Sequence, residues 1–392
     1  MRRYYVDNVR WVTVVIVVIY HVLYMYNAEG ILGGLGKITN LSVQYYDIFM
    51  YLVYPWFMPV LFIAAGMSSR YYLDGHSDRE FVKSRTRKLL VPSTIGLIAF
   101  QFIQGYVSLS LGGAFAELAA AGVPRPFIFL IMLASGSGVL WFVHLLWIYS
   151  MLLVFFRKIE KGRLLRLGAG TPLWLILLFF IPVWGAGQVL NTPIVSVYRF
   201  GLYLAFFFLG YYVFSNDEVM DKLKRCALAL IAAGVTLCVA FSVRYFIIGG
   251  GMNYADVPVN RGLLYAAAAY FGALAMLAGM ARYGDFRNDL TAWMSRKSFG
   301  LYVFHYLGIS SVALFIAKPG LLPATAVYAV SLAAGFVFGY GLYTVISRIP
   351  YYRWAVLGIK EVPDGKEGPE ADEGSGGNGG SDRKKEKKDV QG

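Results

Sequence analysis

Long apolar stretches alternate with short polar segments through the first 346 residues of the chain. Most are about 20 residues long, the length of α-helix that crosses the hydrocarbon core of a bilayer. The pattern predicts an all-α integral membrane protein, a bundle of about ten transmembrane helices. The predicted spans are residues 11–27, 46–69, 89–110, 138–156, 172–189, 198–214, 226–248, 262–281, 299–317 and 322–346. Spans five and six are short, and membranes tolerate irregular helices where these line a protein cavity.

Lysine and arginine gather in every second segment between the spans. The rich segments are the N-terminus and those after spans two, four, six and eight, whereas each of the others holds about one basic residue. Because positively charged segments face the cytoplasm, this alternation predicts an even number of spans with both termini cytoplasmic. The net charge of +13 is then a sign of membrane orientation, and we expect no nucleic-acid partner.

Composition agrees with a multi-pass protein of the cell membrane whose main partner is the lipid bilayer. Hydrophobic residues make up 58% of the chain and charged residues 15%, whereas soluble domains average about 25% charged residues. We expect residues 1–347 to form one transmembrane domain, with the first span retained because no small-residue cleavage site follows it. Residues 361–392 have almost no apolar content and are predicted to be a disordered, charged, Gly-rich cytoplasmic tail.

The first predicted span contains a titratable side chain, His21, eleven residues after Arg10. Eleven residues bring an α-helix almost back to the same face, about 16 Å further along its axis. A titratable group at membrane depth is costly, so it suggests a functional site. In the alternative interpretation, Arg10 is a cytoplasmic anchor and His21 is a hydrogen-bonded packing residue.

Two more histidines, His305 and His144, lie within predicted spans. His305 shares one helical face with Tyr302, and His144 follows Trp141 by about one turn. The alternative for Trp141 and His144 is an aromatic cluster at the membrane interface. The remaining histidine, His76, falls in a charged segment and is expected to be solvent-exposed.

A basic stretch, FVKSRTRKLLVP (81–92), runs into the start of the third span and is expected to be a loop. Its Arg85 and Lys88 suit an anionic ligand such as a phosphate, although a topology signal alone explains such a cluster as well. No spacing typical of a zinc site, a serine-hydrolase elbow or a P-loop occurs in the chain. We therefore expect no metal and no bound cofactor.

The segments described so far resemble the membrane-bound acyltransferase-3 family, in the expected order. Arg10 followed by ten residues and His21 resembles the family's N-terminal motif. The other matching segments are LFIAAGMSSR (61–70), FVKSRTRKLLVP (81–92), LWFVHLL (140–146) and SFGLYVFH (298–305). Three positions depart from the family pattern: Ala65 replaces a serine, Met67 a phenylalanine and Lys88 an arginine. Lysine keeps the charge at position 88 but lacks the planar fork that binds phosphate bidentately.

The resemblance implies an O-acyltransferase. Such an enzyme moves an acyl group, commonly acetyl, from acyl-CoA (acetyl-CoA) to a hydroxyl of a cell-envelope carbohydrate or similar acceptor. His21 would act as a general base or carry the acyl group covalently, and the sequence leaves both open. Arg10, Arg85 and Lys88 would hold the phosphates of coenzyme A.

The remaining candidates complete the implied site. His305 is a second catalytic candidate and would enter the cavity with Tyr302, whereas Trp141 and His144 would face the arriving acceptor. A transporter or proton-coupled carrier is the main alternative, because intramembrane histidines also serve proton relays. A non-catalytic scaffold is a third.

Overall fold

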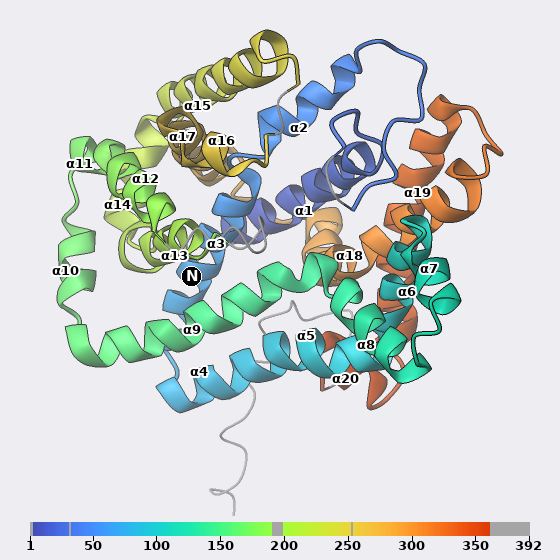
Figure 1. Cartoon of the computed structure of the whole chain (residues 1–392). Helices are drawn as coiled ribbons and strands as arrows, with labels where there is room; N and C mark the ends of the chain where they lie inside the picture. The colour runs from blue at the N-terminus through green and yellow to red at the C-terminus, as the bar shows by residue number, and fades with distance from the viewer. Residues whose placement is uncertain (1–2, 31–32, 190–198, 252–253, 361–392) are drawn as a thin grey trace, which may run out of the picture.

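The computed structural model describes residues 3–30, 33–189, 199–251 and 254–360 (Figure 1). Its first ten α-helices are α1 (Tyr4–Met25), α2 (Ile48–Val53), α3 (Phe57–Leu73), α4 (Asp78–Arg85), α5 (Val91–Gly96), α6 (Phe102–Leu111), α7 (Ala114–Ala120), α8 (Arg125–Gly136), α9 (Trp141–Glu160) and α10 (Arg163–Ala169). The second ten are α11 (Leu173–Leu178), α12 (Phe180–Gln188), α13 (Phe200–Leu209), α14 (Asp217–Arg225), α15 (Ala227–Ser242), α16 (Val257–Arg261), α17 (Leu263–Tyr283), α18 (Asp289–Val312), α19 (Ala324–Ile346) and α20 (Tyr352–Leu357). Two short 3-10 helices are η1 (Tyr45–Asp47) and η4 (Gly138–Leu140). The π-helical segments are η2 (Thr86–Leu90), η3 (Leu97–Gln101), η5 (Gly210–Phe214), η6 (Val243–Ile248) and η7 (Ala313–Ala317).

The predicted all-α class is confirmed for the described part of the chain. Eight predicted spans coincide with helices long and apolar enough to cross a membrane. The fifth span falls on a helix pair, Arg163–Ala169 with Leu173–Gln188, bent by 111°, and counting this pair as one span makes nine within the described residues. The sixth falls on a shorter apolar helix, Phe200–Phe214. A total of ten spans therefore stays a prediction.

The predicted basic loop is wrong, because residues 78–111 form one continuous helical run. The run begins at a capping box, in which the Ser77 side chain accepts from the backbone of Glu80 and the Glu80 carboxylate accepts from Ser77. Pro92 lies inside this run, where it removes one backbone donor. The π-helical η2 immediately before it changes the hydrogen-bond pattern there and lets the helix continue.

Contacts between distant segments gather the Lys/Arg-rich ends at one end of the bundle, which we call the N-terminal face. Arg3 forms an ion pair with Asp217 (2.5 Å), and Asn8 donates to the carbonyls of Gly284 and Phe286. Other ties run from Arg157 to Asp78 and from Lys222 to the Thr171 carbonyl. All five basic segments predicted from the sequence thus lie at this end. The side of the membrane that it faces stays a prediction.

Helix α1 lies in the middle of the bundle, against α18, α3, α17 and α19 (Figure 1). The interface between α18 and α19 depends on glycine, because a Cβ at Gly308 would overlap the carbonyl of Ala334, and one at Gly339 would overlap Leu301. Small residues let helix backbones approach closely inside membranes, where burial of apolar surface supplies little attraction. This contact fixes the position of α18 and hence of His305.

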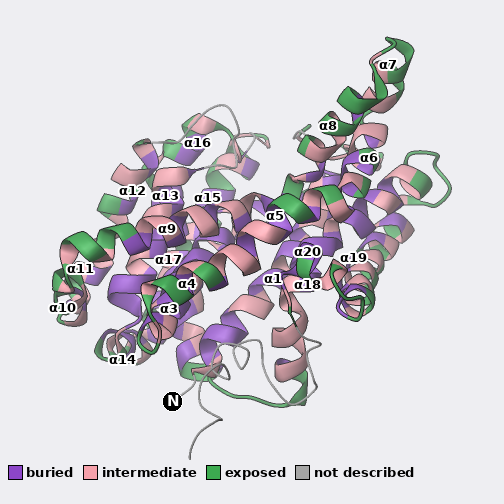
Figure 2. Cartoon of the chain, turned by 90° about the horizontal axis from the view of Figure 1, so that it is seen from below, coloured by how far each residue is buried: buried purple, intermediate pink, exposed green. Residues whose placement is uncertain are grey.

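An arm made of α6, α7 and α8 extends from the bundle, with the exposed α7 at its tip (Figure 2). Helix α8 was not predicted, because its 12 residues are too few for a span. It packs against α6 through Gly105 and Gly136, where a Cβ would overlap the partner backbone. The contact between α1 and α18 lies in the body of the bundle and not in this arm.

Candidate functional site

Two intramembrane histidines meet in the body of the bundle. His305 Nε2 lies 3.1 Å from His21 Nδ1, and the ring centroids are 4.9 Å apart. Both α1 and α18 begin at the N-terminal face, and each histidine is roughly 25 Å along its helix from the first residue. Because α1 and α18 are parallel neighbours with the same rise per residue, the two imidazole rings lie at the same depth in the bundle. His305 is fully buried and His21 is partly buried.

The backbone acceptors assign the ring protons. His305 Nδ1 lies 3.0 Å from the Leu301 carbonyl and 2.8 Å from that of Tyr302, so this nitrogen carries the hydrogen and donates. In a neutral ring His305 Nε2 is then an acceptor. His21 Nδ1 lies 2.8 Å from the Val17 carbonyl and 3.1 Å from that acceptor, so it also carries a hydrogen, which the two acceptors share. We therefore assign the lone pair of neutral His21 to Nε2, the atom able to take a proton.

Aromatic rings surround His21. Tyr20, Tyr24 and Tyr306 have centroids 5.1, 5.9 and 5.3 Å from the imidazole, each at a steep angle. The Tyr306 hydroxyl also donates to the Gly33 carbonyl (2.9 Å), which ties the segment after α1 to α18. These contacts restrict the orientation of the imidazole and keep its surroundings largely apolar.

Arg10 lies on the same stripe of α1, about 16 Å closer to the N-terminal face than His21. Its guanidinium donates to the Ser68 hydroxyl of α3 and lies 3.5 Å from the Asp7 carboxylate. Ser68 in turn donates to the Ala64 carbonyl (2.8 Å). Arg10 is thus held between α1 and α3, and its contact with Ser68, which lies in the 61–70 motif, was not predicted.

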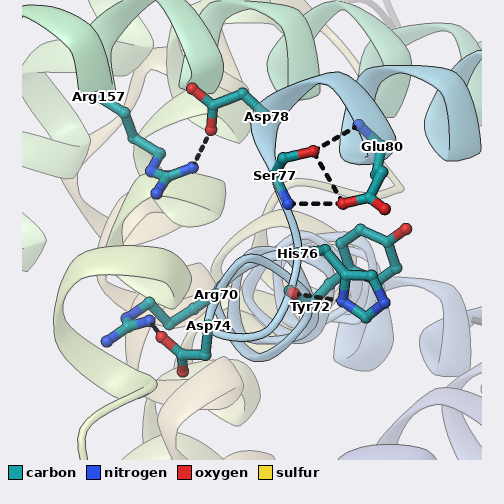
Figure 3. Close-up of polar contacts among 8 residues, drawn as sticks. All are labelled: Arg70, Tyr72, Asp74, His76, Ser77, Asp78, Glu80 and Arg157. Carbon is teal, nitrogen blue, oxygen red and sulfur yellow. Dashed lines mark hydrogen bonds and ion pairs between the residues drawn. The ribbon is translucent and has the colours of Figure 1, made fainter. Parts of the chain in front are cut away.

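Arg85 and Lys88 lie on the helical run that starts at the N-terminal face. Arg85 is the last residue of α4, with its guanidinium 5.0 Å from the Phe81 ring centroid, and Lys88 lies in η2. Both are partly buried. Figure 3 shows how this region is fastened: Asp78 at the start of α4 pairs with Arg157 of α9.

The same view shows His76, expected from the sequence to be solvent-exposed, at the end of the preceding helix. Its ring stacks on Tyr72 with centroids 4.1 Å apart, and its Nδ1 donates to the Tyr72 carbonyl (3.0 Å) (Figure 3). Arg70 and Asp74 pair one turn away. His76 is thus partly buried and belongs to the packing of the N-terminal face.

Each of the other three predicted site residues makes a packing contact, two with backbone carbonyls and one with an aromatic ring. The Tyr302 hydroxyl donates to the Val139 carbonyl, and the His144 Nε2–H donates to the Ser93 carbonyl (2.8 Å). Trp141, the first residue of α9, packs against Tyr203 with ring centroids 5.4 Å apart. Tyr302 is 6.2 Å from the His305 ring, so it borders the histidine pair.

Arg199 is a buried charge that sequence analysis did not select. It is 1% exposed and donates to the hydroxyls of Tyr54 and Tyr265 (2.7 Å for Tyr265). Its position beside the short sixth span was the available signal, because an arginine at the edge of an apolar segment needs partners. Tyrosine hydroxyls supply them here.

The described residues contain no group of three His, Cys, Asp or Glu side chains that could hold a metal ion. The fold and the site thus define a helical, multi-pass membrane protein with two imidazoles in contact between its spans.

A family model described as "Acyltransferase domain" (Acyl_transf_3) matches residues 3–344. The chain belongs to this acyltransferase-3 family, as the sequence motifs predicted, and the family indicates membrane acyltransferase activity. Neither the curated proteins nor the solved structures contain a significant match.

Proposed function

We propose that the protein is an O-acyltransferase that moves an acyl group, in the first instance acetyl, from acyl-CoA to a hydroxyl of a cell-envelope carbohydrate or similar acceptor. The observation that carries the chemical part of this proposal is the contact between His21 and His305. Family membership supports the reaction class. The donor and the acceptor are proposed from the family resemblance, and the basic residues nearer the N-terminal face support an anionic donor.

His21 acts as the general base. Its Nε2 takes the proton of the acceptor hydroxyl while the hydroxyl oxygen attacks the thioester carbonyl. Collapse of the tetrahedral intermediate breaks the C–S bond, and the proton on Nε2 passes to the departing thiolate. Acyl group, sulfur and proton are then all accounted for without an acyl-histidine, which is the alternative covalent route for His21.

His305 is a positioning residue for this base. Its Nε2 accepts the His21 Nδ1 hydrogen, so it holds the ring with Nε2 unprotonated and ready. When His21 becomes an imidazolium, the same hydrogen bond becomes charge-assisted and therefore stronger. His305 thus favours the protonated state that exists only after proton transfer has begun.

Basic residues nearer the N-terminal face hold the donor. Arg10, Arg85 and Lys88 supply cations for the phosphates of coenzyme A, whose flexible arm carries the thioester toward His21. Arg85 and Lys88 lie on a helix fastened at its start, so binding need not order the backbone that carries them. The acceptor approaches from the side of Trp141 and His144.

Incubation of the purified protein with acetyl-CoA labelled in the acetyl group tests the proposal. An acyltransferase consumes the thioester, by hydrolysis or by transfer to added glycan, and the His21→Gln variant does not. A carrier moves solute across a vesicle membrane and leaves the thioester intact. Comparing the masses of surface glycans from cells with and without the protein then identifies the acceptor.

A further inference from the structure

The chain beyond the family match folds back onto the basic helix. The match ends at residue 344 and α19 at Ile346, after which the chain reverses and forms α20. Ala355, Val356 and Leu357 of α20 are buried against α5 and η3, and the Tyr352 hydroxyl donates to the Ala99 carbonyl (2.6 Å). The return of the chain is therefore a packed part of the fold.

The residue after α20 touches the backbone of the proposed donor site. Gly358 has a φ of +68°, and a Cβ there would lie 2.5 Å from the Arg87 carbonyl oxygen and 2.9 Å from the Lys88 Cα. Two residues later, the carbonyl of Lys360 accepts hydrogen bonds from Nε (3.0 Å) and Nη2 (2.8 Å) of Arg353. The chain therefore leaves the described structure at residue 360, close to Lys88.

The sequence that continues from this point is opposite in charge to the helix beside it. Residues 361–373, the acidic segment, contain six carboxylates and one lysine, whereas residues 78–88, the basic segment, contain five cations and two carboxylates. Both carboxylates of the basic segment are already engaged, Asp78 with Arg157 and Glu80 with Ser77. A chain of 13 residues reaches up to about 40 Å, so the acidic segment can cover the whole basic segment.

We propose that the acidic segment docks on the basic segment and competes with the anionic donor for Arg85 and Lys88. Attachment through α20 holds it nearby, so even weak surface ion pairs act at a high effective concentration. The competition rests on the proposed function, whereas the docking itself does not. Residues 361–373 lie outside the described structure, and the proposal uses only their sequence and point of attachment.

Carbodiimide cross-linking of the full chain in phosphatidylcholine nanodiscs tests the docking. The reagent joins a carboxyl to an amine as an amide and takes up the water lost. Mass spectrometry should find peptides that join residues 361–373 to Lys83 or Lys88, in excess over those that reach Lys158. Equal cross-linking to all three lysines would contradict the proposal. So would loss of the cross-links in phosphatidylglycerol nanodiscs, because lipid headgroups would then be the occupant.

Two matched triple variants separate the acidic segment from general tail charge. Each replaces three carboxylates by amides outside the described helices. The test variant carries Asp364→Asn, Glu367→Gln and Glu370→Gln, and the control carries Asp382→Asn, Glu386→Gln and Asp389→Asn.

Coenzyme A binding is the second measurement. The test variant should bind coenzyme A about threefold more tightly or better, with the control unchanged, because loss of a competitor raises apparent affinity. Saturating coenzyme A should also reduce the cross-links to Lys88. Cross-links that persist unchanged would contradict a shared site. If no form binds coenzyme A, the donor assignment fails, and cross-linking alone decides whether the segment docks.

Discussion

His21 Nδ1 and His305 Nε2 lie 3.1 Å apart, although 284 positions of sequence separate the two residues. The contact requires α1 and α18 to run in parallel from the same end of the bundle. The contact also distinguishes the two neutral rings. The lone pair of His21 is on Nε2, which does not contact His305, whereas the lone pair of His305 is on Nε2, which contacts His21. Substitutions of His21 and of His305 should therefore have different effects on activity.

Replacement of His21 by Gln should abolish most activity without unfolding the protein. Gln keeps hydrogen-bonding groups and a similar length but has no titratable nitrogen, so turnover should fall by about 10²–10⁴-fold. The matched control is His76→Gln, since His76 makes the same type of Nδ1 bond to the carbonyl four residues earlier. Steady-state transfer of labelled acetyl is the measurement. Near-normal turnover in well-folded His21→Gln would rule out the proposed base.

Replacement of His305 by Phe should lower kcat and leave the KM for the donor unchanged. Phe keeps a ring but removes one of the two acceptors of the His21 Nδ1 hydrogen and leaves the Val17 carbonyl, and a charge-assisted hydrogen bond contributes roughly 1.5–3 kcal/mol. The expected loss is about 10- to 150-fold. His305→Gln should recover part of it, because the amide oxygen accepts. Equal rates for Phe and Gln would indicate a packing role.

Arg85→Ala and Lys88→Ala should each raise the KM for acyl-CoA by about 10- to 150-fold, because each removes a charge-assisted phosphate contact. Lys88→Arg should not weaken donor binding. Lys158→Ala is the control, an exposed lysine near the same face. If the alanine variants insert normally and keep their donor KM, the basic segment serves topology alone.

Glu29 should make stability depend on pH. Burial raises the pKa of this carboxyl, which accepts from the Tyr51 hydroxyl, from 4.5 to about 8. The folded state then binds the proton more tightly than the unfolded state. The stability that the protonated carboxyl contributes is full below about pH 4.5 and is lost as the pH rises through about 8.

Glu29→Gln isolates this effect. The amide stays neutral, so the variant should melt at least about 2 °C above the natural protein at pH 9 and within error of it at pH 4.5. Thermal unfolding in detergent at both pH values measures the difference. A parallel shift at both would show that the carboxyl does not titrate across this range.

A reporter fused after residue 360 should be active only in the cytoplasm. The Lys/Arg-rich segments share one end of the bundle, and positive segments are retained inside. A second fusion at Lys37, in the segment between α1 and α2, should report the opposite side. Activity of the first fusion outside the membrane would invert the predicted topology.

The sequence predicted the helices that are long and apolar and the residues that are chemically unusual. A histidine within an apolar stretch stands out regardless of its neighbours, so His21 and His305 were found separately. Their contact was not predictable, because it depends on the parallel packing of α1 and α18 and on the close approach of α18 to α19 at Gly308. Tertiary packing of this kind leaves no local signal.

Local composition misled the prediction in the basic segment, and the sequence carried no signal for α20. Charge density indicated a loop before the third span, whereas a capping box and a π turn keep the chain helical there. At α20, six residues are too few for a periodic pattern, and Tyr351 before it has a φ of 62°, which no sequence rule anticipates for tyrosine.

The π-helical η2 has a consequence for how the N-terminal face is oriented. A π turn holds one residue more than the α turn it replaces. The side chains before the turn are therefore rotated about the helix axis by roughly 100° relative to those after it. Arg85 lies before this offset, whereas Ser93, which receives the His144 bond, lies after it. Deletion of a single residue within 86–90 would restore regular α-helical winding. The basic residues before η2 would then face a different direction relative to the helix after it. The length of this short stretch, as much as its charge, sets the direction in which Arg85 points.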